Sequence, residues 1–320
     1  MKSIRNIAVL GLGTMGHGIA QAFAAAGFQV RGFDEQKAAR KDALKLIKRN
    51  LKDFVAAGLM RQSSVDPLLR RIQVCDSEAE AVQGAQFVTE AVLEDLALKQ
   101  DLFARLEELV PADTILASNS STFTISQSGA KMRRPERAIV THWFNPPHIV
   151  PVVEVVPGPR TSPRVTNATL ALMKRTGKEA IRIDREMPGF VVNRVQVAVM
   201  REVWSLLDQG VASPEAIDAA ICGSMGFRLA ALGPLEVHDF GGLDLQARVF
   251  GNLVREISSS TRLPGKIREL VDAGHFGAKT GKGIYDYTPA SLAARRTRRD
   301  QRILALLKMF YTRKPRASAK

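Results

Sequence analysis

The sequence predicts an α/β fold with a doubly wound parallel sheet, followed by a smaller all-helical domain. In the first half, short Val- and Ile-rich runs bounded by Gly, Pro, Asn or Ser alternate with longer segments of helical periodicity. This alternation is typical of βαβ units, whose helices cover both faces of a parallel sheet. After Met187-Pro188-Gly189-Phe190 the strand-like runs stop and the helical patterns continue. We therefore expect a domain boundary near residue 185.

Each expected element follows from its periodicity and its bounding residues. The expected strands are Ile7–Leu10, Gln29–Phe33, Phe87–Glu90, Thr114–Ala117, Ala138–Thr141 and Val152–Val156, with Ala180–Ile183 closing the sheet. The expected helices are Gly16–Ala26, Gln36–Ala57 and Asp95–Leu109, then Val191–Gly210, Pro214–Ile221, Leu243–Ser258 and Leu263–Ala273. The expected domains cover residues 1–185 and 186–290, with a basic extension over 291–320.

Composition excludes several classes of protein. The 320 residues are 45% hydrophobic and 24% charged, which is ordinary for a globular chain of two domains. No apolar run approaches the roughly 20 residues that span a bilayer, so we expect no membrane span. The two cysteines lack metal-ligand spacing and are too few for a disulfide framework. We expect a soluble cytoplasmic protein without a metal site.

The net charge of +14 comes mostly from the C-terminal end. Residues 289–320 hold ten basic side chains against one acid, Asp300. Leu304, Leu307 and Phe310 lie among them at loosely helical spacing. We expect a surface helix that docks on its own domain or on a partner subunit. We do not expect nucleic acid as a partner, because no base-reading motif accompanies the charge, although the charge alone leaves an RNA-binding or membrane-binding arm open.

A glycine-rich turn follows the first expected strand. Gly11-Leu12-Gly13-Thr14-Met15-Gly16 fits G-x-G-x-x-G and opens a helix. In this pattern the glycines permit the tight turn, the approach of a pyrophosphate and close helix–strand packing. Asp34 ends the next strand 18 residues after Gly16, where a carboxylate binds the ribose hydroxyls and repels a 2′-phosphate. The sequence therefore predicts a Rossmann-like domain that binds NAD.

A histidine and a glutamate are candidate catalytic residues. His142 follows the strand Ala138–Thr141, and Glu154 interrupts the valines of Val152–Val156. A carboxylate among valines costs several kcal/mol to bury unless it is paired, and His142 is the nearby candidate partner. Such a pair beside a nicotinamide suits alcohol oxidation, with the imidazole as base. Spacing alone leaves open that His142 caps a strand while Glu154 faces solvent.

Two other polar segments are less specific. Ser118-Asn119-Ser120-Ser121-Thr122 follows a strand end. It is read first as a helix N-cap, and its hydroxyls could also serve a substrate oxygen. Asn193 lies on the first helix of the second domain and says little by itself.

Several motifs together resemble the 3-hydroxyacyl-CoA dehydrogenase family, which includes a lambda-crystallin/L-gulonate 3-dehydrogenase branch and carnitine dehydrogenases. The motifs are GLGTMGHGIA, TEAVLEDLALKQDLF, ASNSS, HWFNPP with Glu154 twelve residues after its histidine, PGFVVNR, VASPEAID, GPLEVHDFGGLD and FGAKTGKGIYDY, which cover roughly residues 4–287. The resemblance implies His142 as catalytic base with Glu154 as its partner, and Ser121 and Asn193 at the substrate oxygen. It also implies NAD contacts from Gly11, Leu12, Gly13, Thr14, Met15, Gly16, Asp34, Glu94, Lys99, Ser121, Asn145 and Lys279, and a homodimer formed through the helical domain.

The substrate expected from the resemblance is a short-chain (S)-3-hydroxyacyl-CoA, oxidised to the 3-oxoacyl-CoA as in fatty-acid β-oxidation. The basic helix over Lys37–Lys52 could hold the phosphates of CoA, or it is simply a solvated face. The stretch Leu229–Pro234 and the basic extension after Tyr287 depart from the acyl-CoA members, and the preceding Gly226-Phe227-Arg228 together with Pro146-Pro147 is closer to the lambda-crystallin branch. The alternatives are therefore a small free hydroxy acid, such as L-gulonate or carnitine, and a non-catalytic NAD-binding protein of the crystallin type.

Overall fold

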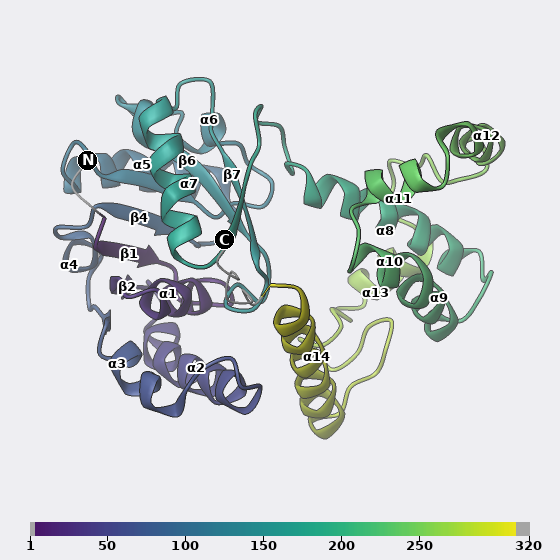
Figure 1. The fold of residues 1–320 in the computed structure, drawn as a ribbon, viewed down its shortest axis with the longest axis horizontal. Coiled ribbons are helices and arrows are strands. Elements are labelled where there is room, and N and C mark those ends of the chain that lie inside the picture. Colours follow the sequence, from purple (N-terminus) through teal and green to yellow (C-terminus); the bar gives the residue numbers. More distant parts are fainter. Residues whose placement is uncertain (1–3, 312–320) are drawn as a thin grey trace, which may run out of the picture. The chain divides into compact units, whose positions relative to one another are not determined.

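An eight-stranded sheet lies at the centre of the N-terminal part of the computed structural model, which describes residues 4–311 (Figure 1). The strand order is β3-β2-β1-β4-β5-β6-β7-β8. The strands are β1 (Asn6–Leu10), β2 (Gln29–Phe33), β3 (Ile72–Val74), β4 (Phe87–Glu90), β5 (Ile115–Ser118), β6 (Ala138–Trp143), β7 (Val152–Val156) and β8 (Glu179–Arg182). The order reverses between β1 and β4, where open α/β sheets bind ligands. The expected doubly wound fold is confirmed.

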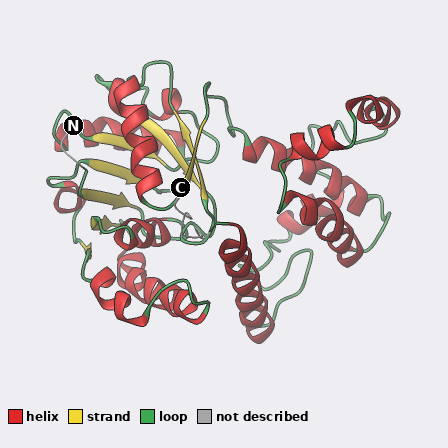
Figure 2. Ribbon diagram, in the orientation of Figure 1, coloured by secondary structure: helices red, strands yellow, loops and turns green. Residues whose placement is uncertain are grey.

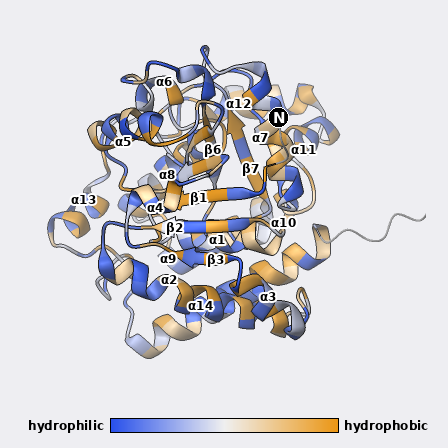
Figure 3. Ribbon diagram, turned by 90° about the vertical axis from the view of Figure 1, so that its left-hand side faces the viewer, coloured by the Kyte–Doolittle hydropathy of each residue, from blue (hydrophilic) through white to orange (hydrophobic). Residues whose placement is uncertain are grey.

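Both faces of the sheet are buried along the central strands β1, β4, β5 and β6, which explains why these strands are mainly apolar. In β1, orange over much of its length in Figure 3, Ile7 and Val9 belong to one core cluster while Ala8 and Leu10 belong to the other. Alternate residues of a strand point to opposite faces, so each face has its own core. Such two-sided burial removes the alternation of polar and apolar residues found in one-sided sheets.

The sheet is predominantly parallel, and the pair β6–β7 is antiparallel. The connection over residues 144–151 is too short for the crossover that parallel neighbours need. The chain therefore turns back directly after β6 and places β7 beside it in the opposite direction. β8 runs parallel to β7 and ends the sheet, as expected for the run near Ala180.

Helices surround this sheet in the N-terminal part of the chain (Figure 2). They are α1 (Gly16–Ala25), α2 (Lys37–Ala56), α3 (Val65–Leu69), α4 (Glu78–Val82), α5 (Leu96–Leu109), α6 (Ile125–Ser128) and α7 (Pro163–Arg175), with 3₁₀ turns η1 (Gln62–Ser64) and η2 (Pro135–Arg137). Helix α1 packs its apolar residues into one core and α5 into the other. The expectations for α1, α2 and α5 are confirmed, whereas α3, α4, α6, α7 and β3 were not expected from the sequence.

The following part of the chain is helical. Its elements are α8 (Val192–Asp208), α9 (Pro214–Ile221), the π-helical η3 (Cys222–Gly226), α10 (Phe227–Leu229), α11 (Pro234–Phe240), α12 (Leu243–Leu253), α13 (Gly265–Asp272) and α14 (Pro289–Phe310). No single helix among residues 4–311 is long and apolar enough to cross a membrane. The pair Pro214–Leu229 and Pro234–Phe240 meets that length and composition together, with a bend of 88°.

The chain divides into two compact units. The first runs through Asn193 and includes the segment from Ile303 onwards, and the second is Arg194–Arg302. In the first unit, Leu304 of α14 is buried and Lys308 donates a hydrogen bond to the Ala57 carbonyl at 3.4 Å. This end of the basic helix thus docks on its own chain. The limits 1–185, 186–290 and 291–320 stay predictions, and residues 312–320 lie outside the described part.

Candidate functional site

The glycine-rich turn joins β1 to α1. Gly11 has φ +86°, and a Cβ there would lie 2.5 Å from the Ala91 carbonyl oxygen. A Cβ on Gly16 would lie 1.6 Å from the Gly11 oxygen, so neither position admits a side chain. At Gly13 nothing lies within 4 Å of such a Cβ, which leaves its backbone open to a ligand. No side chain caps the N-terminus of α1, so its first N–H groups suit a pyrophosphate.

Asp34 lies directly after β2, beside this turn. Its carboxylate accepts hydrogen bonds from the Leu12 N–H at 2.7 Å and the Gln36 N–H at 2.8 Å. These bonds fix the carboxylate against the dinucleotide loop, where it is partly buried. Leu12 and Asp34 are thereby brought together, as the sequence predicts. The glycine positions, the open helix N-terminus and this acid fit NAD.

We expect the Asp34→Ser variant to lose preference for NAD over NADP. The variant removes a negative charge that would repel a 2′-phosphate and an acceptor for the ribose hydroxyls. The dissociation constant of NADP divided by that of NAD, both measured by fluorescence titration, should fall by at least about tenfold. This change corresponds to about 1.4 kcal/mol. Glu35→Ser, one residue further on, is the matched control. An unchanged ratio in Asp34→Ser would contradict this role.

His142 and Glu154 lie directly opposite each other in the antiparallel pair β6–β7. Their side chains meet, with the His142 Nδ1 2.8 Å from the Glu154 Oε2. Both are almost completely buried, at 2% and 1% exposure. The alternative in which Glu154 faces solvent is therefore wrong. Because Nδ1 donates its proton to the Glu154 carboxylate, Nε2 is the ring nitrogen that can act as an acceptor.

The second oxygen of Glu154 is also engaged. Its Oε1 accepts hydrogen bonds from the N–H groups of Val191 and Val192, both at 3.1 Å, where α8 begins. The adjacent residue, Asn193, donates from Nδ2 to the Ser121 carbonyl at 3.0 Å. The start of α8 thus connects Glu154 to the segment after β5. Sequence reasoning did not foresee this connection.

A charged network holds the segment that contains Ser121. Glu94 accepts hydrogen bonds through Oε1 from the Ser121 N–H at 2.9 Å and from the N–H and hydroxyl of Thr122. The Ser120 hydroxyl donates to the same oxygen at 2.6 Å. Burial opposes ionisation of Glu94, but hydrogen bonds from Ser120 and Thr122, with the Lys99 charge, lower its pKa below the ordinary value. The carboxylate therefore stays ionised and keeps the segment in place.

Lys99 is buried in the same network. Its Nζ lies 2.9 Å from both oxygens of Glu90 and 3.3 Å from Glu94. The Ser118 hydroxyl also donates to Glu90, which is completely buried. Glu90 was not among the residues predicted from the sequence. A carboxylate at the end of a mainly apolar strand was the available signal. Contacts of Glu94 and Lys99 with NAD stay predictions.

The segment over 118–122 is not the N-cap of the next helix. Thr124 caps α6, with Gln127 completing a capping box. Asn145 is exposed and follows β6 in the loop that leads to β7. Lys178 holds this loop through hydrogen bonds to the carbonyls of Pro147 and Val150 at 2.8 and 2.6 Å. Burial lowers the pKa of Lys178 to about 7.

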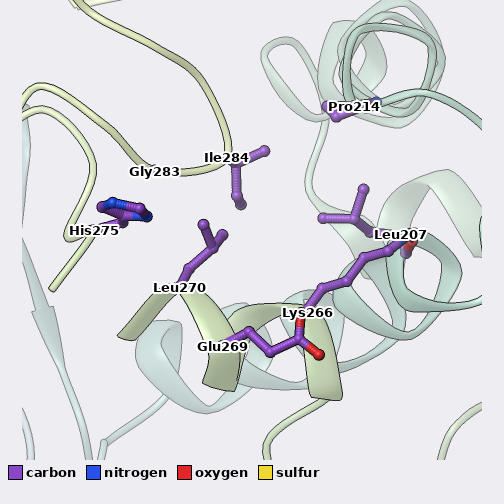
Figure 4. A pocket seen from close by; sticks show the side chains of 8 residues that line it. All are labelled: Leu207, Pro214, Lys266, Glu269, Leu270, His275, Gly283 and Ile284. Atoms are coloured by element: carbon purple, nitrogen blue, oxygen red, sulfur yellow. Dashed lines mark hydrogen bonds between the residues drawn. The ribbon is translucent and has the colours of Figure 1, made fainter. Parts of the chain in front are cut away.

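The remaining predicted residue, Lys279, belongs to the second unit. It is exposed, in a turn after α13. The same unit has a hollow of about 390 Å³, where the side chains of Leu207, Leu270 and Ile284 point toward one another (Figure 4). Its lining includes none of the residues predicted from the sequence. Among residues 4–311, no group of three or more His, Cys, Asp or Glu could hold a metal ion.

Comparisons with known proteins match both parts of the chain. The model for the 3-hydroxyacyl-CoA dehydrogenase NAD binding domain matches residues 6–187, and the model for the C-terminal domain of the same enzymes matches residues 189–287. The chain is 33% identical over 307 residues to a 5-formyl-3-hydroxy-2-methylpyridine 4-carboxylate 5-dehydrogenase of Mesorhizobium japonicum, covering 96% of this chain and 98% of the relative.

Two further comparisons agree. A probable 3-hydroxybutyryl-CoA dehydrogenase of Bacillus subtilis is 37% identical over 285 residues, covering 89% of this chain and 98% of the relative. A solved 5-formyl-3-hydroxy-2-methylpyridine 4-carboxylic acid 5-dehydrogenase, described as NAD⁺-dependent, has a TM-score of 0.90 at 33% identity, covering 97% of this chain and 100% of that structure. The cofactor is NAD, as expected, and the chain belongs to the NAD-dependent oxidoreductases of the 3-hydroxyacyl-CoA dehydrogenase family.

Proposed function

We propose that this protein oxidises a hydroxyl group of an organic substrate, with His142 as the catalytic base. The observation that carries the proposal is the buried hydrogen bond between His142 Nδ1 and Glu154. It orients the ring so that Nε2 can accept the hydroxyl proton, and the carboxylate stabilises the imidazolium that forms. NAD, when bound, would accept the hydride from the carbon that bears this hydroxyl group.

Ser121 and Asn193 are the groups proposed to hold the substrate oxygen. The hydrogen bond from Asn193 to the Ser121 carbonyl brings them together, and Glu94 holds the backbone on that side. Polar groups fixed before the substrate binds cost little reorganisation during the reaction. This arrangement supports a role in orienting the hydroxyl group toward His142. A catalytically inactive protein of the crystallin type has less support, because the His142–Glu154 pair is intact.

The proposed substrate is a short-chain (S)-3-hydroxyacyl-CoA, such as 3-hydroxybutyryl-CoA, converted to the 3-oxoacyl-CoA. The relative from Bacillus subtilis and the family models support this choice. The seven basic residues over 37–52 of α2 give CoA phosphates a positive surface. A place in fatty-acid β-oxidation in the cytoplasm goes with this proposal.

A second candidate substrate is a small free acid that carries an oxidisable hydroxyl group, or an aldehyde group to which water has added to give a hydrate that bears one. The specific support is the match to the Mesorhizobium japonicum pyridine carboxylate dehydrogenase, which covers 96% of this chain against 89% for the Bacillus subtilis relative. Because it covers 96% of this chain, the match extends into α14, whereas the family models end at residue 287. L-gulonate and carnitine belong to the same class of free hydroxy acids.

The deciding experiment measures NADH formation with each candidate side by side. The panel is 3-hydroxybutyryl-CoA, L-gulonate, carnitine and the pyridine carboxylate aldehyde. Turnover of 3-hydroxybutyryl-CoA with a kcat/KM at least about 100-fold above the others supports the first proposal. Turnover of a free acid alone supports the second candidate, and no turnover of any substrate contradicts both. The His142→Gln variant serves as the control for contaminating activity.

We also propose that the protein forms a homodimer through its helical unit. Helices α10, α11 and α12 expose large apolar side chains when the chain is taken by itself. These are Phe227 at 76%, Leu235 at 86%, Phe240 at 77% and Phe250 at 67%. So many large apolar side chains exposed along three successive helices suggest a surface that a partner covers. A second copy of the chain is the occupant that the family resemblance implies. The hydrophobic cover would come from the same helices of the partner.

We expect light scattering to give a mass of twice 35.0 kDa for the full chain. Phe250→Glu should shift the protein toward the monomer, because a buried unpaired charge disfavours the interface. Met309→Glu is the matched control, since Met309 of α14 is equally exposed at 73% but lies outside α10–α12. A monomeric wild-type protein at micromolar concentration would refute the dimer.

A further inference from the structure

Phe190 has the least common backbone conformation of the first unit. Its φ is +50°, and it is the one non-glycine residue with positive φ among residues 4–311. Bulky L-residues rarely adopt this left-handed region, and such outliers are found where the surrounding structure enforces them. The residue before it, Gly189, is also left-handed at φ +77°. Two consecutive left-handed residues therefore turn the chain sharply just before α8.

The turn aims backbone groups at Glu154. Directly after Phe190, the N–H groups of Val191 and Val192 converge on Glu154 Oε1, each at 3.1 Å. Successive N–H groups made parallel by a left-handed residue form a concave anion-binding feature. The turn is itself held, because Gly189 donates to the Thr122 carbonyl at 3.3 Å. The backbone of Phe190 thus decides whether Glu154 receives these two hydrogen bonds.

The ring of Phe190 reaches the other member of the pair. It is completely buried, and its centroid lies 5.5 Å from that of the His142 imidazole, at an angle of 53°. Phe144 contacts the same imidazole at 4.5 Å. With Glu154 holding Nδ1, the two aromatic rings limit the tilt of the imidazole. One residue therefore supports His142 through its side chain and Glu154 through its backbone.

We propose that Phe190 is a positioning residue for the His142–Glu154 pair, acting through its buried ring and its left-handed backbone. This inference rests on the proposed function of that pair. A misplacement of about 1 Å in a reacting group can cost about 10²-fold in rate. Loss of Phe190 should therefore lower kcat and leave the KM for NAD nearly unchanged, because Asp34 and the glycine-rich turn are untouched.

Two substitutions separate the roles of ring and backbone. Phe190→Gly removes the ring but tolerates the left-handed conformation, whereas Phe190→Val removes the ring and disfavours that conformation. We expect kcat to fall about tenfold in Phe190→Gly and about 100-fold in Phe190→Val, with KM for NAD within about twofold of wild type. Phe28→Val is the matched control, because Phe28 is equally buried but has ordinary backbone geometry.

A second measurement does not depend on any substrate. The hydrogen-bonded His142 Nδ1 proton should give a downfield proton NMR resonance, assigned by its loss in His142→Asn. We expect this resonance in wild type and Phe28→Val, shifted in Phe190→Gly and absent in Phe190→Val. An unshifted resonance in both Phe190 variants overturns the proposal, as does wild-type kcat in both. If Phe190→Val fails to fold, Phe190→Gly decides alone by the same criteria.

The two measurements also separate this inference from the proposed function. If wild type turns over none of the substrates in the panel, the proposed function fails. The NMR resonance of His142 still decides whether Phe190 positions the ring. If wild type is active and the resonance and kcat do not respond to either Phe190 substitution, the inference fails while the proposed function stands.

Discussion

Replacing His142 by glutamine should lower kcat by a factor of about 10²–10⁴, the usual contribution of a general base. Glutamine can still fill the space and hydrogen-bond to Glu154, but it cannot accept a proton from the substrate. The dissociation constant of NAD should stay within about twofold, because the glycine-rich turn and Asp34 are separate from this pair. Steady-state kinetics and a fluorescence titration of NAD measure the two quantities. Full activity in this variant would refute the role of His142.

A double-mutant cycle with Glu154 tests whether the two residues act as one unit. Glu154→Gln should lower kcat by itself, because the imidazolium loses its charged partner and Val191 and Val192 lose a charged acceptor. Residues that act together show non-additive losses. The combined variant should therefore be no slower than His142→Gln alone. Fully multiplicative losses would indicate that Glu154 acts independently of His142.

Most of the sheet could be predicted because each buried strand is a short apolar segment that can be seen in the sequence itself. The strands β1, β4 and β7 are mainly apolar runs bounded by glycine, proline or polar residues, and the predicted limits of β1, β2, β4 and β7 match within one residue. Strand β3 has three residues with a glutamine at its centre, which no apolar pattern distinguishes from a loop. Helix α7 carried a usable signal, since Ser162 caps it and Pro163 begins it.

The candidate site depends on strand register, which the local pattern does not specify. The distance of twelve residues between His142 and Glu154 was compatible with a pair or with two unrelated side chains. The antiparallel pairing of β6 and β7 places them directly opposite each other and decides between the two. The same limit applies to Phe190, because a left-handed phenylalanine has no pattern of its own. Glu90 had a signal, a carboxylate ending an apolar strand, but its partner Lys99 lies on α5.

Replacing Lys99 by methionine should destabilise the first unit by about 3–5 kcal/mol, because it leaves a buried carboxylate without its cation. The Lys99 Nζ contacts both oxygens of Glu90, and the two side chains are 1% and 0% exposed. The Ser118 hydroxyl and the Val92 N–H would then be the remaining partners of Glu90. Urea denaturation, followed by a probe in the first unit, measures the change.

Lys131→Met is the matched control for this loss. Lys131 pairs with Asp101, but these side chains are 51% and 61% exposed, and exposed pairs contribute about 0–1 kcal/mol. A second variant, Lys99→Met with Glu90→Gln, should recover much of the stability, since no charge is then left buried without a partner. Because Lys99 also contacts Glu94, the single variant should loosen the backbone at Ser121 and raise the KM of the substrate. Equal stability of Lys99→Met and Lys131→Met would mean that the buried Lys99–Glu90 pair does not stabilise the first unit more than an exposed ion pair does.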